Sequence, residues 1–556
     1  MKLKGAIQTV AFAAAALAVW AAAGPALAEV EPAIDSFQTP KVREPRIPNR
    51  SVEVTQFGAV ADGHTLNTQA IAQAIDALAS EGGGRLVFPR GVWLSGPVEL
   101  KDNIELHLEE GALLQFTRQY DQYPFHAIRI KDHAEMAVTA PIWAYDAENI
   151  AITGRGVIDG GGDAWRPVKR YKMTSRQWRD LMRSGVYDRE TGIWWPTQEA
   201  CDAATGKIVP PRDSTDPRDW EPLRVFMRPQ LVKLVLCRRV LLEGVTFQNS
   251  PAWNLNPTAC EDLTVRDVTV RNPWYSQNGD GLDLVSCRNV LVTGSRFDVG
   301  DDAICLKSGE DELGRRLALP TENIVIRDCV VYHGHGGFVI GSEMSGGVRD
   351  VRVDNCVFIG TDTGLRFKST RGRGGVVERV YITNITMTDI PGEAILFDLY
   401  YEGDAPLDGH GNIRDTTRRP EPVSEETPLF KDIYMRHIVC RGARRAALLQ
   451  GLPEMPLQDI HLEDVSIASE LGAVAMDAED ISLARVAILP KSGPVVQMSG
   501  CRDVVIDSLE YPNAASAVLS LHGTGNADIL LRNTTIPDDG ELQLVHGATR
   551  DALSVD

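Results

Sequence analysis

A ten-residue pattern of polar and apolar positions recurs along most of the chain. Each copy opens with two polar residues, has aliphatic residues at its third and fifth positions, and ends on an aliphatic or aromatic residue. Examples are EDLTVRDVTV from Glu261 and ENIVIRDCVV from Glu322. Further copies start at Glu148, Arg238, Arg288, Arg349, Glu378, Lys431, Gln458, Glu479, Arg502 and Ala527. Self-similarity at such a period is typical of a solenoid.

The spacing of the copies predicts which solenoid this is. From Arg238 onward the starts lie 21 to 34 residues apart, except for one interval of 53 between Glu378 and Lys431, which we interpret as two units with one weakly marked copy. The aliphatic positions alternate with period two, and Gly, Asn and Asp separate the copies, which indicates strands and turns. A leucine-rich repeat would need a helix-compatible half. We therefore predict an all-β, right-handed parallel β-helix.

The chain is expected to form one long domain, because each unit of a solenoid contacts only its neighbours. We predict a signal peptide over residues 1–28 and an extended lead over 29–56. An N-terminal cap with the first coils should occupy 57–120. A β-helix catalytic domain should follow over 121–545, with a tryptophan-rich insertion at about 160–227.

The cap is predicted to contain one amphipathic helix. Ile71, Ile75 and Leu78 recur at helical spacing, Asn67 and Thr68 offer an N-cap, and glycines at 82–84 end the helix. Alternating strands follow over 85–88 and 104–108. A helix of this kind would cover the unpaired backbone of the first coil.

The first 28 residues have the features of an export signal. Lys2 and Lys4 precede an alanine-rich run through Trp20, and Ala26 to Ala28 offers a small-residue cleavage site. No later stretch is apolar for the length that a membrane helix requires. We expect a periplasmic or extracellular protein with no membrane partner.

The insertion holds half of the ten tryptophans, namely Trp165, Trp178, Trp194, Trp195 and Trp220. One interpretation is a packed excursion from the solenoid. The other is a wall at one end of a binding groove, with indole faces presented to sugar rings. The sequence leaves both open.

Charge narrows the range of partners. The formal net charge is -19, and it becomes -21 without Lys2 and Lys4, which argues against nucleic acid. An acidic substrate would need a local basic cluster, and the densest one consists of Arg366, Lys368, Arg371 and Arg373. The alternative for these four residues is a solvated basic turn.

The nine cysteines follow the repeat rather than a metal-binding spacing. Cys237, Cys260, Cys287 and Cys501 each precede a repeat start, and Cys329 and Cys356 occupy the eighth position of theirs. Equivalent positions stack at roughly 4.8 Å in neighbouring coils. We expect ladders of small buried thiols, although that distance also admits one or two disulfides.

Four short motifs lie at similar places in successive repeats and carry the candidate chemistry. They are NGDGLD with Asp280 and Asp283, GDD with Asp301 and Asp302, GHG with His335, and RFK with Arg366 and Lys368. A β-helix would align them on one face. Neighbouring carboxylates can then act as acid and base on a glycosidic bond, and crowding should raise the pKa of one of them. Turn-capping aspartates, a calcium site and a structural turn histidine are the alternatives.

Together these motifs, with RPQ at Arg228 and NSPAWNLNP at Asn249, resemble those of polygalacturonases in glycoside hydrolase family 28, whose fold is the pectin lyase-like solenoid. The resemblance extends from about Phe57 to Tyr401. Two departures are Gly279, where the family has Thr, and Phe367, where it has Ile. We expect Phe367 to replace an inward aliphatic side chain.

The resemblance implies a role for each site residue. Asp301 would be the general acid, Asp280 and Asp302 would hold and activate water, and His335 would support ionisation of the acid. The substrate-binding residues would be Arg366, Lys368, Asn278, Tyr401 and Lys307, with Arg366 and Lys368 gripping a uronate carboxylate. Inversion would place the carboxyl groups about 6.5 to 9.5 Å apart. No metal or cofactor is implied.

The function predicted from the sequence is hydrolysis of α-1,4-galacturonosyl bonds in an acidic polysaccharide or oligogalacturonide, with attack at chain ends. The alternatives are a galacturonidase acting on rhamnogalacturonan oligosaccharides, a pectate lyase that needs Ca²⁺ and an Arg or Lys base, and a non-catalytic polysaccharide-binding β-helix.

Overall fold

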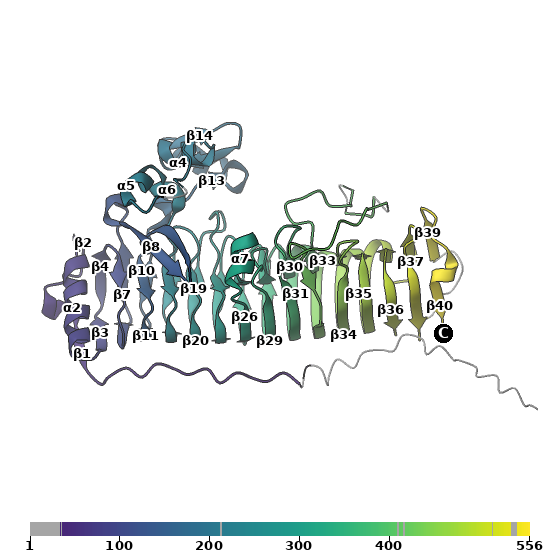
Figure 1. Ribbon diagram of the computed structural model, residues 1–556, viewed down its shortest axis with the longest axis horizontal. Coiled ribbons are helices and arrows are strands. Elements are labelled where there is room, and N and C mark those ends of the chain that lie inside the picture. Colours follow the sequence, from purple (N-terminus) through teal and green to yellow (C-terminus); the bar gives the residue numbers. More distant parts are fainter. Residues whose placement is uncertain are drawn as a thin grey trace, which may run out of the picture.

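A computed structural model of the chain shows a long parallel β-helix (Figure 1). The structure describes residues 34, 36–211, 214–408, 411–414, 417–513, 515–534 and 542–556. The predicted signal peptide therefore lies outside the described residues. Within the described ranges, no helix is long and apolar enough to cross a membrane.

The solenoid has three faces, each a parallel ladder. The face that carries the sequence repeats, here called the repeat face, is formed by β1 (Ser51–Glu53), β3 (Gly84–Phe88), β6 (Ile104–Leu108), β11 (Glu148–Gly154), β17 (Arg238–Glu243), β20 (Glu261–Arg266), β23 (Arg288–Thr293), β26 (Thr321–Arg327), β29 (Val348–Ile359), β31 (Val376–Asp398), β33 (Ile433–Gln450), β34 (Leu457–Met476), β35 (Ala478–Ser499), β36 (Arg502–Asp507), β38 (Ala527–Arg532) and β40 (Leu553–Val555). β29, β31 and β33 to β35 are long enough to continue onto other faces.

A second face consists of short strands that follow the repeats. These are β2 (Asp62–Leu66), β4 (Gly91–Ser95), β7 (Ala112–Phe116), β12 (Val157–Asp159), β18 (Thr246–Gln248), β21 (Thr269–Arg271), β24 (Arg296–Asp298) and β27 (Val330–Val331).

The third ladder, here called the site face, carries the acidic motifs. Its strands are β5 (Val98–Glu99), β10 (Ile142–Tyr145), β16 (Val232–Val235), β19 (Leu255–Thr258), β22 (Leu282–Val285), β25 (Ile304–Lys307), β28 (Gly336–Ile340) and β30 (Thr363–Lys368), then the ends of β31 and β33 to β35, and finally β37 (Ala517–His522) and β39 (Leu542–Val545).

The repeat starts align in register, which confirms the pattern. Arg238 pairs with Glu148 and Glu261, and the alignment continues through Arg288, Glu322, Arg349 and Glu378. The interpretation of the 53-residue interval is wrong. Val380 pairs directly with Ile433, so Glu378 and Lys431 begin adjacent coils. The additional residues form a surface excursion between β31 and β32 (Leu429–Phe430).

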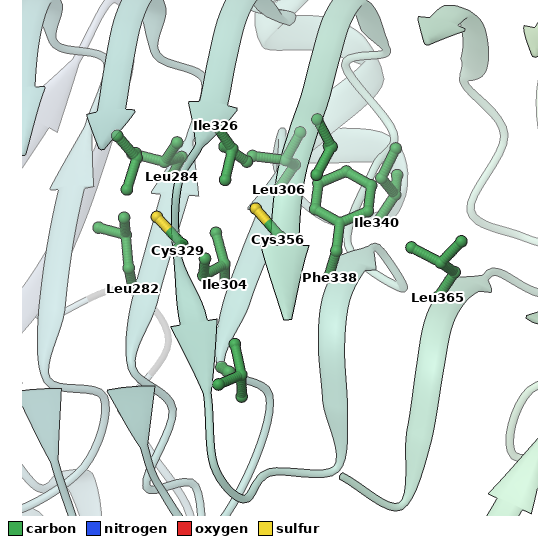
Figure 2. Close-up of a cluster of buried hydrophobic side chains, with 14 of the residues drawn as sticks. Leu282, Leu284, Ile304, Leu306, Ile326, Cys329, Phe338, Ile340, Cys356 and Leu365 are labelled. Atoms are coloured by element: carbon green, nitrogen blue, oxygen red, sulfur yellow. The ribbon is translucent and has the colours of Figure 1, made fainter. Parts of the chain in front are cut away.

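The interior is a continuous column of stacked apolar side chains. Figure 2 shows the part beneath the acidic motifs, where Leu282, Ile304, Phe338 and Leu365 occupy matching positions on successive strands. Phe367 is fully buried and stacks on Phe397 with ring centroids 4.2 Å apart, which confirms its inward orientation. Burial of this kind contributes roughly 1.5 to 3 kcal/mol per large side chain.

All nine cysteines are buried and free. This confirms the prediction of buried thiols and not the alternative of one or two disulfides. The register extends to the residues that precede paired strands and therefore aligns Cys237, Cys260 and Cys287. Cys329, just before β27, aligns with Cys356 in β29, so these two thiols are neighbours in a second ladder (Figure 2).

The N-terminal cap contains α2 (Thr68–Ser80) after a short 3₁₀ turn, η1 (Val54–Phe57), and buries Ile71, Ile75 and Leu78 as predicted. The expected N-cap bond is absent: Asn67 accepts from the backbone of Val60 and donates to the carbonyl of Leu94 instead. The amide thus ties the helix start to β4.

The lead is extended over residues 37–50, as predicted, and crosses the repeat face along the lower edge in Figure 1. Arg43 pairs with Asp262 at 2.5 Å, and Phe37 contacts the ring of Tyr381. The sheet already begins at Ser51, inside the segment assigned to the lead, and it continues through β40, beyond the predicted end of the domain.

Four excursions stand next to the site face. A hairpin of β8 (Phe125–Ile130) and β9 (His133–Val138) follows η2 (Tyr120–Gln122). The insertion contains η3 (Gly162–Ala164), β13 (Val168–Lys169), η4 (Arg170–Lys172), α3 (Ser175–Leu181), β14 (Val186–Asp188), β15 (Ile193–Trp195), α4 (Gln198–Ala204), α5 (Pro217–Trp220), η5 (Glu221–Leu223) and α6 (Arg224–Met227). α7 (Asp311–Leu317) follows β25, the excursion after β31 rises from the same side (Figure 1), and η7 (Arg550–Ala552) lies near the C-terminus.

Candidate active site

The register of four neighbouring strands brings the acidic motifs into one column. β22, β25, β28 and β30 pair in that order, with Leu282 opposite Ile304 and Ile304 opposite Phe338. Since the first three motifs place their aspartates and histidine just before β22, β25 and β28, Asp280 aligns with Asp302, and Asp301 aligns with His335. Arg366 and Lys368 lie within β30. This confirms the predicted column on one face.

Three carboxylates converge at the head of this column. One oxygen from each of Asp280, Asp301 and Asp302 lies within 4.8 Å of the others. This figure is the closest approach of single oxygens, whereas the separation of about 6.5 to 9.5 Å expected for inversion is measured between carboxyl groups. The three oxygens can approach one another because the side chains belong to neighbouring coils and consecutive turn positions. The predicted separation of the carboxyl groups stays a prediction.

Asp302 is buried and held by two cations. Arg366 Nη1 lies 3.0 Å from Oδ1, and Lys368 Nζ lies 2.7 Å from Oδ2. Burial favours the neutral acid, but the charges of Lys368 and Arg366 outweigh it and hold the pKa of Asp302 well below its usual range. Asp302 is therefore an ionised acceptor.

Asp301 faces His335, whose Nδ1 lies 3.0 Å from Oδ1. Burial acts to raise the pKa of Asp301, but the hydrogen bond from His335 outweighs it, and the net shift is downward. The placement of His335 beside Asp301 agrees with the implied support of ionisation.

Asp280 is the member of this trio whose proton affinity is increased. It is buried, and its Oδ1 has no hydrogen-bond partner among the described residues. Burial, together with the charges of Asp283 and Asp301, raises the pKa of Asp280 well above its usual value. Crowding thus raises one carboxyl pKa, as expected, but at Asp280 and not at Asp301, because Asp301 has a histidine partner.

Lys307 is buried beside the column, in register with Lys368 through Gly341. Its ammonium is 2.9 Å from Glu343 and 3.8 Å from Asp283, and it lies over the ring of Trp253. Asp283 is fully buried, and neither carboxyl oxygen has a hydrogen-bond partner within the described part of the chain. Burial raises the pKa of Asp283 to about 8 against the opposing charge of Lys307. These groups form a buried polar cluster next to the trio.

Asn278 is exposed and fixed by an arginine of the RPQ motif. Arg228 donates to Asn278 Oδ1 and to the carbonyl of Gln277, each at 2.8 Å. Burial lowers the pKa of Arg228 to about 10. Arg228 therefore orients the turn that carries Asp280.

The glycine at position 279 has a steric cause. A Cβ atom there would lie 1.9 Å from Ser276 Oγ, and one at Gly300 would lie 2.4 Å from the same oxygen. Both turns pack against Ser276, so neither has room for the threonine side chain that the related motifs carry at position 279.

The basic cluster divides into two pairs. Lys368 and Arg366 lie at the column, with Tyr401 beside both at 4.9 and 5.7 Å from its ring centroid. Arg371 pairs with Glu454 at 2.7 Å, and Arg373 pairs with Asp311 at 2.8 Å. The solvated-turn interpretation is wrong for this second pair, because other excursions supply carboxylates to them.

The insertion contacts the column through a residue that the sequence analysis did not select. Lys172 Nζ lies 3.3 Å from His335 Nε2 and 3.4 Å from the carbonyl oxygen of Gly300. Burial lowers the pKa of Lys172, and the charge of Asp301 opposes that shift. A lone lysine in a polar excursion gives no sequence signal of such a contact.

The tryptophans of the insertion do not form a wall of exposed rings. Trp165, Trp194 and Trp195 are buried within the excursion, and Trp178 and Trp220 are half-buried. The packed interpretation therefore holds for them. Among the described residues, Trp274 presents an exposed indole, 53% accessible, and lines a cleft of about 970 Å³ with Asp163 and Arg166 of the insertion.

The carboxylate trio has the donor set of a cation site, but Asp301 and Asp302 already have partners. Lys368 and Arg366 neutralise Asp302, and His335 bonds to Asp301. A divalent cation would have to compete with these groups, whereas an acid and base pair uses them directly.

Comparison with known proteins places this column in a family. Residues 224–416 match the profile of Glycosyl hydrolases family 28. A probable polygalacturonase of Vitis vinifera is 28% identical over 463 residues, covering 80% of this chain and 81% of the relative. An exo-poly-alpha-D-galacturonosidase of Dickeya chrysanthemi is 30% identical, covering 65% and 58%. An endo-polygalacturonase of Pectobacterium carotovorum subsp. carotovorum is 28% identical, covering 56% and 66%.

A solved structure agrees over the same share of this chain as the Vitis vinifera relative. The hyperthermoactive exopolygalacturonase from Thermotoga maritima superposes with a TM-score of 0.64 at 31% identity, covering 80% of this chain and 94% of that one. The similarity therefore extends through the coils that carry the carboxylate column.

Proposed function

This chain belongs to glycosyl hydrolase family 28, and from that premise we propose that it is an exported hydrolase that releases galacturonosyl units from the ends of α-1,4-linked galacturonan chains, with inversion. The family makes it a glycoside hydrolase of the polygalacturonase group. The end-wise attack, the stereochemistry and the export are our proposals.

The observation that carries the proposal is the juxtaposition of the carboxylate trio with Arg366 and Lys368. The trio offers an acid and base pair, and the two cations match a uronate carboxylate. With a neutral sugar bound, Asp302 would be the anionic partner of both cations, and the ligand would add no charge to pair with them. The site therefore favours a galacturonosyl residue.

The proposed roles follow the family assignment, with one addition from the electrostatics. Asp301 would protonate the leaving oxygen, while Asp280 and Asp302 hold the water. In the free protein the pKa of Asp301 is lowered, so it must gain a proton when substrate binds. A bound uronate adds negative charge and removes solvent, and both changes raise a carboxyl pKa.

End-wise attack is supported by covers on both sides of the column. Towards the N-terminus, the β8–β9 hairpin lies over β10, with its His126 ring 4.9 Å from that of Trp143, and its tip reaches α7 through an Arg316–Asp132 ion pair. The hairpin is visible crossing the strands in Figure 1.

The second cover is the excursion after β31. Ile413 and Leu407 pack on Leu396, Leu448 and Val474, so the site face is occupied directly beyond β30. A long galacturonan could not extend along the face in both directions, which supports seating of a chain end. This differs from our sequence-based reasoning, which assigned closure to the insertion alone.

Product analysis tests the mode of attack. Polygalacturonate digestion should release mono- or digalacturonate early, with little fall in viscosity per reducing end formed. A commercial endo-acting preparation serves as the viscosity control. A rapid viscosity drop at low hydrolysis would show attack within the chain and remove the end-wise proposal.

The stereochemistry has its own measurement. Proton NMR of the first turnovers should show the β-anomer of the released galacturonate before mutarotation. Initial α-anomer would indicate a retaining reaction, for which the close approach of the carboxylates would be the structural basis. Unsaturated products absorbing in the ultraviolet would instead indicate a lyase.

A further inference from the structure

Lys172 is buried at the end of η4, while its neighbour Tyr171 is 75% accessible. This lysine reaches out of the insertion to His335 in the column, 163 positions later in the chain. A contact over that sequence distance depends on how the insertion is seated, so it links the excursion to the carboxylate trio.

The hydrogen-bond inventory of the contact allows one arrangement. A lysine ammonium has donors only, so His335 Nε2 must accept the bond from Lys172 at 3.3 Å. A neutral imidazole that accepts at Nε2 carries its proton on Nδ1. That nitrogen lies 3.0 Å from Asp301 Oδ1, which accepts the hydrogen bond from the Nδ1–H group. The donors therefore point in sequence from Lys172 to His335 to Asp301.

A competing group makes this direction dependent on Lys172. The carboxylate of Asp362 lies 3.8 Å from the same Nε2, on the side chain of an exposed residue. An acceptor at that distance favours a proton on Nε2. The charged groups that face the His335 ring are thus Asp301 at Nδ1, and Lys172 and Asp362 at Nε2. Lys172 favours an unprotonated Nε2, whereas Asp362 favours a protonated one.

We propose that Lys172 is a positioning residue, which holds His335 in the tautomer that donates to Asp301. It prevents Asp362 from accepting a hydrogen bond from a protonated Nε2. The insertion is then part of the active-site machinery and not only a cover. The proposal rests on the proposed function for its kinetic consequences, but the tautomer itself is a property of the free protein.

The decisive experiment is ¹⁵N NMR of the full-length protein labelled at histidine. The chain has 11 histidines, so His335 is assigned by the signals that disappear in His335→Asn. In the parent protein at neutral pH, Nε2 should be unprotonated and Nδ1 protonated. A protonated Nε2 in the parent overturns the proposal without any Lys172 variant.

Lys172→Met should shift the proton to Nε2 or protonate both nitrogens, because Asp362 then acts unopposed. Lys172→Met/Asp362→Asn should restore the Nδ1–H tautomer, since the competing carboxylate is gone. Lys169→Met, in β13 just before η4, is the matched control and should leave the signals unchanged. An unchanged tautomer in Lys172→Met would overturn the proposal.

Kinetics on oligogalacturonides separate positioning from substrate contact. Lys172→Met should lower kcat by roughly tenfold or more, the effect of losing one hydrogen bond to a charged group, with a smaller change in KM, and the double variant should recover part of kcat. A higher KM at unchanged kcat would make Lys172 a substrate ligand and refute the positioning role. If no galacturonan is cleaved, the proposed function fails while the NMR result still decides the role of Lys172.

Discussion

Two stretches of the site face have the same backbone ladder and opposite chemistry. In the catalytic coils, β22 to β30, the outward positions carry Asp283, Arg366 and Lys368, and they surround the carboxylate trio. In the covered coils, β33 to β35, the outward positions carry Leu448 and Val474 beneath the excursion after β31. The ladder supplies equivalent positions, and the side chains together with their cover decide what each position does.

The register makes the comparison residue by residue. Arg366 aligns with Leu396 and then Leu448, while Lys368 aligns with Asp398 and then Gln450. One coil beyond Arg366, the outward side chain is already packed under the excursion. The boundary between open and covered face is therefore a single coil wide, which suits a site for chain ends.

Asp301→Asn should produce the largest effect in the catalytic coils. Loss of the transferable proton should reduce turnover on polygalacturonate by roughly 10² to 10⁴, with substrate binding retained. An aryl galacturonide with a good leaving group needs little protonation, so its hydrolysis should suffer far less. Asp280→Asn is the comparison, because a water-holding residue should matter equally for both substrates. Full activity of Asp301→Asn on polygalacturonate would refute its assignment as the acid.

Leu448→Ala addresses the covered coils at the position aligned with Arg366. Removing a buried leucine should lower the free energy of unfolding by about 2 to 5 kcal/mol, because Ile413 and Leu407 lose their packing partner. Thermal and denaturant unfolding report the change, and kcat on short oligogalacturonides should stay at the parental value. A loss of kcat without loss of stability would mean that the two regions are not separate.

Lys368→Ala tests charge recognition. The loss should be about 1.5 to 3 kcal/mol in kcat/KM on free polygalacturonate, with KM raised less for methyl-esterified chains. Because Lys368 also holds Asp302, some loss should be common to both substrates. Gln450→Ala is the matched control in the covered coils and should leave both unchanged. An equal loss on both substrates would argue against a carboxylate contact.

Asp283 should make stability dependent on pH. Its pKa of about 8 in the folded protein exceeds the usual 3.8, so folding favours the protonated form. The stabilisation is complete below about pH 4 and is lost as the pH rises towards 8, by at most about 1.4 kcal/mol per pH unit. Asp283→Asn should make the unfolding midpoint less dependent on pH across this range. If the variant keeps the parental change of unfolding midpoint with pH, other groups cause the dependence.

Chelation should have the smallest effect. If the trio acts as an acid and base set balanced by Arg366, Lys368 and His335, activity should persist in EDTA. Assays in EDTA, with Ca²⁺ added back, measure this. Loss in EDTA with recovery on Ca²⁺ would favour the lyase interpretation and a cation among the carboxylates.

The sequence alone determined the solenoid and the column. Period-two alternation and polar repeat starts specify strands whose register stacks them. Once the fold was a β-helix, Asp280 therefore had to align with Asp302, and Asp301 with His335. The inward position of Phe367 and the buried thiols follow from the same periodicity. These inferences succeed because each depends on contacts between adjacent repeats.

The tertiary structure alone decided which groups meet across excursions. No periodicity relates Lys172 to His335, Arg371 to Glu454, or the β8–β9 hairpin to α7, because these contacts depend on how irregular segments are seated. Likewise, the pKa of Asp280 is raised while that of Asp301 is lowered because their partners differ, not their residue type. The covered coils show the same limit: the 53-residue interval resembled two repeats, but it is one coil whose excursion closes the face.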